Sequence, residues 1–146
     1  MNSFRFPLQK ALDWRRIQAE LQEERFRQQT AALEGIDHAC AQVTAAGNAA
    51  EQQVRVWNPV AGGELAALGG YRLHVKLQET EMAVTRSECR KELTKRESVM
   101  LEARRQLRLL EHLKERRLAE WTKARDKELE ELASDVYLAK WKRRPE

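Results

Sequence analysis

The sequence predicts an all-α protein, a long antiparallel two-helix coiled-coil hairpin that ends in a C-terminal helical overhang. The stretch from Tyr71 to Arg144 contains neither glycine nor proline and is rich in strong helix formers. Upstream, between Leu8 and Trp57, apolar residues recur at every seventh position. The main cluster of helix breakers lies between these two segments, where a hairpin needs its turn.

The first helix is expected from about Phe6 to Trp57, because two rows of residues repeat every seventh position with alternating gaps of four and three. Gly35 and Gly47 each cost about 1 kcal/mol against alanine, but they do not end a helix that is packed along one side. The rows are Leu12, Ala19, Phe26, Leu33, Cys40, Gly47, Val54 and Leu8, Arg15, Gln22, Gln29, Ile36, Val43, Ala50, Trp57.

The turn is expected at about residues 58–63, and it extends to residue 70 if the second helix starts late. Pro59 disfavours helical geometry at the residue before it, and the pairs Gly62-Gly63 and Gly69-Gly70 allow the chain to reverse. Residues 64–68 are good helix formers, so the second helix begins either near Gly63 or only at Tyr71 and continues to about Lys142. Such a helix extends roughly 110 Å and needs a partner along its length.

Antiparallel pairing requires that the numbers of facing residues add up to a constant. Sums of about 122, 129 and 136 all fit the heptads. They place Cys40 near Met82, beside Cys89 or near Arg96, respectively. Whichever sum holds, the chain beyond roughly Leu129 has no partner helix. Its apolar stripe is therefore expected to be a surface for another protein, and it consists of Leu129, Leu132, Val136 and Ala139.

The seam of the second helix is irregular. Arg96, Lys114 and Arg117 interrupt its apolar stripe, and beyond Trp121 the stripe shifts by four residues, which locally unwinds a coiled coil. Polar layers on the first helix weaken the same seam. These irregularities favour a coiled coil that shares its surface with other proteins.

The composition argues against an enzyme. Of the 146 residues 34% are charged and 6% aromatic, with a mean hydropathy of -0.74, so one structural unit without a compact core is expected. The three histidines are far apart, and no metalloprotease, hydrolase or phosphate-loop motif occurs. We expect no catalytic site, metal or cofactor and no small-molecule substrate. Cys40 and Cys89 are expected to be small seam residues.

The net charge of +4 comes from acids and bases that are interspersed along both helices, as on a solvated face with helix ion pairs. The exception is a basic tip around Trp141, formed by Lys140, Lys142, Arg143 and Arg144. No apolar run is long enough to cross a bilayer, and residues 1–12 lack the features of a signal peptide. A cytoplasmic location is expected unless a partner holds the chain elsewhere.

The segment from Phe4 to Arg15 resembles the start of the flagellar FliJ family, whose members begin with aromatic-x-aromatic-x-Leu followed by Leu and Arg. Residues 110–117 resemble the family's Glu-x-Leu-x-x-Arg segment, and residues 128–135 resemble its late acidic stretch. Length and hairpin layout match over the whole chain. The middle, with Trp57-Asn58-Pro59 and two glycine pairs, departs from the family and gives no anchor for contacts at the tip.

The resemblance implies a component of the flagellar type III protein export apparatus, similar to the central stalk of rotary ATPases. Its partners would be the hexameric export ATPase, the membrane protein of the export gate and substrate chaperones. It would serve flagellum biogenesis and motility from the cytoplasmic face of the cell membrane. The ATPase-facing candidates are Phe4, Phe6, Leu8, Leu12 and Arg15 on one strand and Arg117, Trp121, Arg125 and Trp141 on the other.

By the same resemblance, replacing Phe4, Phe6 and Leu8 with alanine should weaken the ATPase contact and leave helix content nearly intact. Three alternatives stay open. The stalk protein of a virulence type III secretion system shares the architecture, and a generic coiled-coil scaffold fits the same pattern. A nucleic-acid-binding coiled coil would need a one-sided basic stripe, whereas acidic residues are mixed into the second helix, so no nucleic acid is expected.

Overall fold

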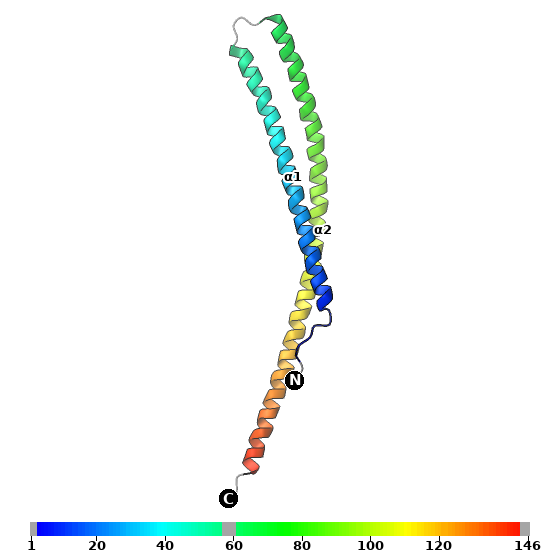
Figure 1. The fold of residues 1–146 in the computed structure, drawn as a ribbon, viewed down its shortest axis with the longest axis vertical. Helices are drawn as coiled ribbons and strands as arrows, with labels where there is room; N and C mark the ends of the chain where they lie inside the picture. The colour runs from blue at the N-terminus through cyan, green and yellow to red at the C-terminus, as the bar shows by residue number, and fades with distance from the viewer. Residues whose placement is uncertain (1–2, 57–60, 144–146) are drawn as a thin grey trace. The chain divides into compact units, whose positions relative to one another are not determined.

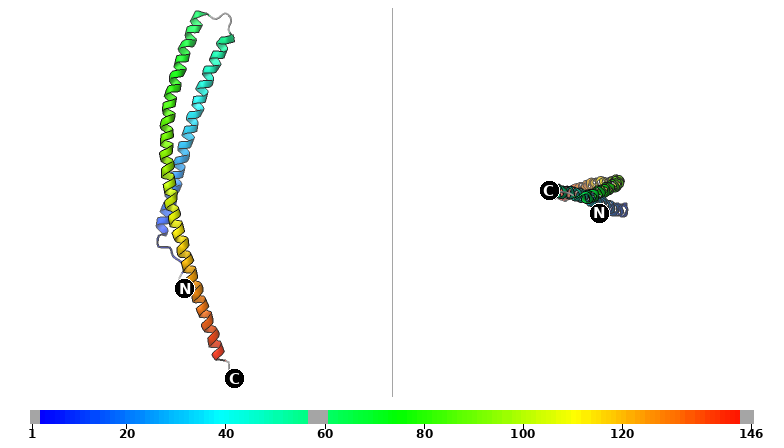
Figure 2. Two further views of the ribbon diagram at one scale, coloured as in Figure 1. Left: turned by 180° about the vertical axis from the view of Figure 1, so that it is seen from behind. Right: turned by 90° about the horizontal axis from the view of Figure 1, so that it is seen from above.

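The computed structural model describes residues 3–56 and 61–143 (Figure 1). These residues form two long helices, α1 Gln9–Val56 and α2 Gly62–Lys142. The helices pack against each other in opposite directions, which confirms the predicted all-α helical hairpin (Figure 2).

Internal contacts divide the chain into two compact units. The middle unit is Glu20–Leu101, and the terminal unit combines Met1–Ala19 with Glu102–Glu146. The sequence predicts a single structural unit, and both helices run through the two units without a break.

Helix α1 begins at Gln9, three residues later than predicted. Pro7 has no amide hydrogen and disfavours helical geometry at Phe6, so Phe6 lies before the helix. The carbonyl of Phe6 accepts a hydrogen bond from the Gln9 amide at 3.1 Å, and that of Leu8 accepts one from the Leu12 amide at 2.9 Å. The predicted end at Trp57 and the first half of the predicted turn, residues 58–60, lie outside the described residues.

Helix α2 begins at Gly62, so the early of the two predicted starts is correct and the start at Tyr71 is wrong. The Ala61 carbonyl accepts hydrogen bonds from the amides of Glu64 and Leu65 at 3.1 and 3.2 Å. In return the Glu64 carboxylate accepts a hydrogen bond from the Ala61 amide at 3.3 Å. This is one half of a capping box, and a carboxylate in the first turn also suits the helix dipole.

The predicted heptad rows form the packed face of α1. In the middle unit every member of both rows that the structure describes is half-buried, from Gln22 to Val54. In the terminal unit Leu12 and Ala19 are buried and Arg15 is half-buried, whereas Leu8 is exposed. The heptad pattern thus located the seam correctly at every described position except Leu8.

The middle unit has the first of the three candidate registers. The numbers of facing residues add up to 122 for Gly47 and Val75 and to 123 for the pairs Glu51 with Arg72 and Asp37 with Arg86. The Arg72 Nε lies 2.8 Å from a Glu51 carboxylate oxygen, and the Arg86 Nε lies 2.6 Å from Asp37 Oδ1. The registers that place Cys40 beside Cys89 or near Arg96 are therefore excluded.

Polar side chains inside the seam find partners across it. The Gln29 amide donates hydrogen bonds to the carbonyl oxygen and the sulfur of Cys89, at 3.3 and 3.1 Å. The Arg96 guanidinium donates to the carbonyl of Arg25 at 3.3 Å and contacts Glu92 on its own helix. Both cysteines have free thiols, Cys89 buried and Cys40 half-buried, as expected for small seam residues.

Candidate functional site

The terminal unit holds most of the residues that the sequence singles out, and its centre is an aromatic contact. The segment before α1 runs beside α2, and the Phe4 ring lies 6.0 Å from the Trp121 ring at an angle of 54°. One turn further along α2, the Arg125 guanidinium lies 5.2 Å from the Trp121 ring centre. It also donates two hydrogen bonds to Asp126 Oδ1, at 2.9 and 3.1 Å. This cluster fixes the N-terminal segment on α2.

A hollow of about 680 Å³ lies where this segment meets α2. Its lining is mainly apolar, and it also includes Arg5 and the ion pair between Arg117 and Glu120, which is 3.6 Å long and exposed. The hollow can take apolar side chains from another molecule, since most of its lining is apolar. Its apolar lining includes Phe4, Phe6, Leu8, Leu113 and Trp121.

Two of the predicted ATPase-facing residues, Phe6 and Leu12, are buried by this chain itself. Phe6 is only 8% exposed and Leu12 only 1% exposed, so both belong to the interior of the terminal unit. A partner cannot reach Leu12 without opening the unit, because its side chain is covered by this chain, whereas Phe6 contributes to the lining of the hollow. Replacement of Phe6 should therefore also destabilise the terminal unit, since deletion of a buried aromatic side chain leaves a cavity. The expectation that the Phe4, Phe6 and Leu8 triple variant keeps nearly all of its helix content stays a prediction.

The other predicted candidates are accessible to different degrees. Leu8 is 43% exposed and Arg117 is exposed, so both present a surface to solvent. Phe4, Trp121 and Arg125 are half-buried in the aromatic contact. Arg15 is half-buried as well, and its guanidinium lies 4.8 Å from the ring centre of Trp14. The hollow thus gathers Phe4, Phe6, Leu8, Arg117 and Trp121 but not Leu12, Arg15, Arg125 or Trp141.

Beyond Arg125, α2 continues as the predicted overhang, which we define as residues 126–143. Every overhang residue is exposed, including the whole predicted stripe of Leu129, Leu132, Val136 and Ala139. Trp141 is 65% exposed. Within the terminal unit, the orange and red end of α2 in Figure 2 has no helix beside it. The predicted overhang is therefore confirmed as an uncovered helix with an apolar stripe.

Several exposed apolar residues of the terminal unit are not among the candidates that the sequence predicts. Trp14 and Ile17 on α1 are more than half exposed, as are Tyr137 and Leu138 on the overhang. They lie outside the heptad rows. Their place in the sequence could therefore have identified them as surface residues. Leu113, Glu120 and Ala124 also line the hollow. The sequence could not place them there, because it left the register of the two helices open.

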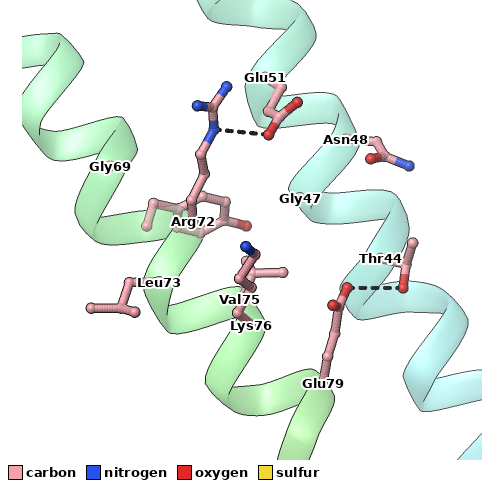
Figure 3. Close-up of a pocket in the computed structure, with 11 residues that line it drawn as sticks. Thr44, Gly47, Asn48, Glu51, Gly69, Arg72, Leu73, Val75, Lys76 and Glu79 are labelled. Atoms are coloured by element: carbon pink, nitrogen blue, oxygen red, sulfur yellow. Dashed lines mark hydrogen bonds and ion pairs between the residues drawn. The ribbon is translucent and has the colours of Figure 1, made fainter.

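The middle unit has a second hollow, of about 530 Å³, beside Gly47 (Figure 3). Four of its polar side chains are engaged in pairs, since Arg72 pairs with Glu51 and the Thr44 hydroxyl donates to Glu79 at 3.3 Å. We interpret this hollow as a packing gap rather than a binding site.

Residues 3–56 and 61–143 contain neither a candidate metal site nor a candidate membrane span. No cluster of three or more histidine, cysteine or acidic side chains in these ranges could hold a metal ion. In the same ranges, neither helix contains an apolar stretch of the length that a bilayer crossing requires. No protein-family model, curated protein or solved structure matches this chain.

Proposed function

We propose that this chain is a stalk-like component of the flagellar type III protein export apparatus that engages the hexameric export ATPase through its terminal unit. The observation that carries the proposal is the overhang, a helix with an exposed apolar stripe that begins directly after the Phe4 and Trp121 contact. An uncovered stripe of this kind is ordinarily covered by another protein. The resemblance of residues 4–15 to the FliJ family names the protein class.

The surface chemistry of the terminal unit suits a stalk inside a ring. Leu8 and Trp141 offer exposed apolar contacts, while Arg117 and the basic residues near Trp141 offer charged ones. Exposed ion pairs and small apolar contacts are individually weak, so such a surface can touch several subunits without locking onto one. This weakness is an advantage for a stalk that meets successive subunits of a hexamer.

The surface outside the terminal unit would serve the other partners in the export apparatus. The export gate in the membrane and the substrate chaperones would contact parts of the hairpin that lie outside the terminal unit. Attachment to the gate would hold the chain at the cytoplasmic face of the membrane, where it would assist delivery of substrates.

The test uses the full chain with a purified flagellar export ATPase. We expect the chain to bind the hexamer and to raise its rate of ATP hydrolysis, and Leu8→Ala and Trp141→Ala to reduce both effects. Both side chains are exposed, so neither variant should alter the helical circular dichroism. Leu73→Ala in the middle unit is the matched control, because Leu73 is 62% exposed and lies outside the proposed contact surface.

A second measurement separates flagellar from virulence export. The gene should restore motility to a strain that lacks its own flagellar export stalk protein. Failure to bind or stimulate the ATPase would contradict the proposal. Restoration of virulence secretion without motility would reassign the chain to the related system.

A further inference from the structure

The overhang has the sequence pattern of a coiled-coil helix. Leu129, Leu132, Val136 and Ala139 follow one another with gaps of three, four and three, and all four are exposed. Heptad spacing then defines the positions that flank the stripe. Glu128, Asp135 and Lys142 lie along one edge, and Asp126, Ala133 and Lys140 lie along the other.

Charge is unevenly distributed along the overhang. Its first half is acidic, with Asp126, Glu128, Glu130, Glu131 and Asp135 against a single lysine, and its end is basic, with Lys140, Lys142 and Arg143. Among the described residues, Glu128, Asp135, Lys140 and Lys142 take part in no ion pair. These four charged side chains are therefore available to another chain.

We propose that the overhang pairs with the overhang of a second copy of this chain, in the antiparallel direction. In this arrangement Leu132 faces Val136 of the other copy, and Leu129 faces Ala139. Along the edges, equivalent flanking positions of the two helices meet, so Glu128 faces Lys142. Two-fold symmetry repeats every such contact, and the acidic half of each helix lies along the basic end of the other.

Charge selects the antiparallel over the parallel arrangement. A parallel pair brings the acidic halves side by side and likewise the basic ends, and its edges offer only one kind of opposite-charge pair, Asp135 with Lys140. The antiparallel pair offers Glu128 with Lys142, and it brings Lys140 near Asp126, whose carboxylate also accepts hydrogen bonds from Arg125. Its one unfavourable edge contact brings Asp135 near Asp135 of the other copy at the symmetry axis. This contact occurs only in the antiparallel arrangement, so a variant at Asp135 can distinguish the two directions.

The pairing is weak, because the overhang is only about 27 Å long and two such helices bury less area than a stable dimer interface requires. Its ion pairs are exposed and therefore sensitive to salt. The same stripe is the one offered to the export ATPase, so binding of that partner would first separate the two copies. The pairing itself does not rest on the proposed function, since it concerns the purified chain alone.

Sedimentation velocity at low salt tests the pairing. The full chain should show a dimer fraction that grows with concentration between about 10 µM and about 1 mM and that falls when salt is added. A chain that ends at Arg125 should stay monomeric over this range. A full chain that is monomeric throughout would overturn the proposal.

Charge reversals test the direction of pairing. Glu128→Lys and Lys142→Glu should each weaken dimerisation about tenfold, since each creates like-charge contacts twice in the symmetric dimer. An equimolar mixture of the two variants should dimerise again, because the reversed charges then face each other. Glu130→Lys makes the same change of net charge away from the edges, and its effect should be smaller. Failure of the mixture to recover would refute the antiparallel pair.

Asp135→Asn distinguishes the two directions independently. It removes the like-charge contact at the axis of the antiparallel dimer and should strengthen dimerisation. In a parallel dimer the same change would remove the pair with Lys140 and weaken dimerisation, which would exclude our arrangement.

Discussion

The Phe4 ring lies 6.0 Å from the Trp121 ring, and this tilted pair fixes the N-terminal segment to α2. We expect Phe4→Ala and Trp121→Ala each to lower the free energy of unfolding of the terminal unit. The loss in the double variant should fall short of the sum by about 1 kcal/mol, because the two rings stabilise each other. Urea denaturation of the four chains measures this coupling. Trp141 is exposed, so Phe4→Ala combined with Trp141→Ala should show additive losses.

Leu12 and Leu8 are successive apolar residues of the predicted seam, and their environments are opposite. Leu12 is 1% exposed, whereas Leu8 is 43% exposed. Leu12→Ala should therefore lower the free energy of unfolding by about 3 kcal/mol, and Leu8→Ala by a small fraction of that loss. Equal losses in thermal or urea denaturation would show that the two side chains do not differ in burial.

Two glycines of α1 should respond differently to alanine. A Cβ at Gly35 meets no atom within 4 Å, so Gly35→Ala should stabilise the helix by about 1 kcal/mol. A Cβ at Gly47 lies 3.2 Å from a methyl group of Val75, so Gly47→Ala should bring a smaller gain or a loss. Addition of Val75→Ala to Gly47→Ala should remove that crowding. Equal melting temperatures for Gly35→Ala and Gly47→Ala would contradict the close contact.

The register can be tested with an engineered disulfide. A Cβ at Gly47 lies 4.0 Å from the Cβ of Val75, within the range that a disulfide spans. In a background with Cys40→Ser and Cys89→Ser, oxidation of Gly47→Cys with Val75→Cys should give an intrachain cross-link. Non-reducing electrophoresis and mass spectrometry detect it. The natural pair Cys40 and Cys89 should give no intrachain cross-link, because Cys40 and Cys89 do not face each other in this register.

Truncation after Leu129 should leave the helical hairpin folded. All residues from Asp126 to Arg143 are exposed, so their removal deletes no packed side chain. The urea midpoint should stay the same, and the helical signal should fall only in proportion to the residues removed. Affinity for the export ATPase or gate should fall. A lower midpoint would show that the segment is structural, and normal binding with restored motility would show that it is dispensable.

The helices could be predicted from the sequence because their signals are local. The absence of glycine and proline between Tyr71 and Arg144 and the heptad spacing of Leu12, Ala19 and Phe26 need no knowledge of the partner helix. The start of α2 was ambiguous, since Gly69 and Gly70 favour a turn. The cap formed by Glu64 on Ala61 outweighs that local preference.

The register and the accessibility of the site could not be predicted, because both depend on which residues face each other. Three sums fit the heptads equally well, and only contacts such as that of Val75 with Gly47 distinguish them. Phe6 and Phe4 have the same side chain and lie two residues apart, yet Phe6 is buried and Phe4 is half-buried. A terminal aromatic motif indicates a functional end of the chain without showing which ring is covered.

The overhang also has a mechanical consequence. Bending stiffness rises steeply with thickness, so a single helix bends more easily than two helices packed side by side. A sideways force on Trp141 would therefore first bend α2 beyond Arg125, and the contact between Phe4 and Trp121 would remain intact. The overhang is therefore a flexible connection. A protein bound to it could shift sideways without separating the N-terminal segment from α2.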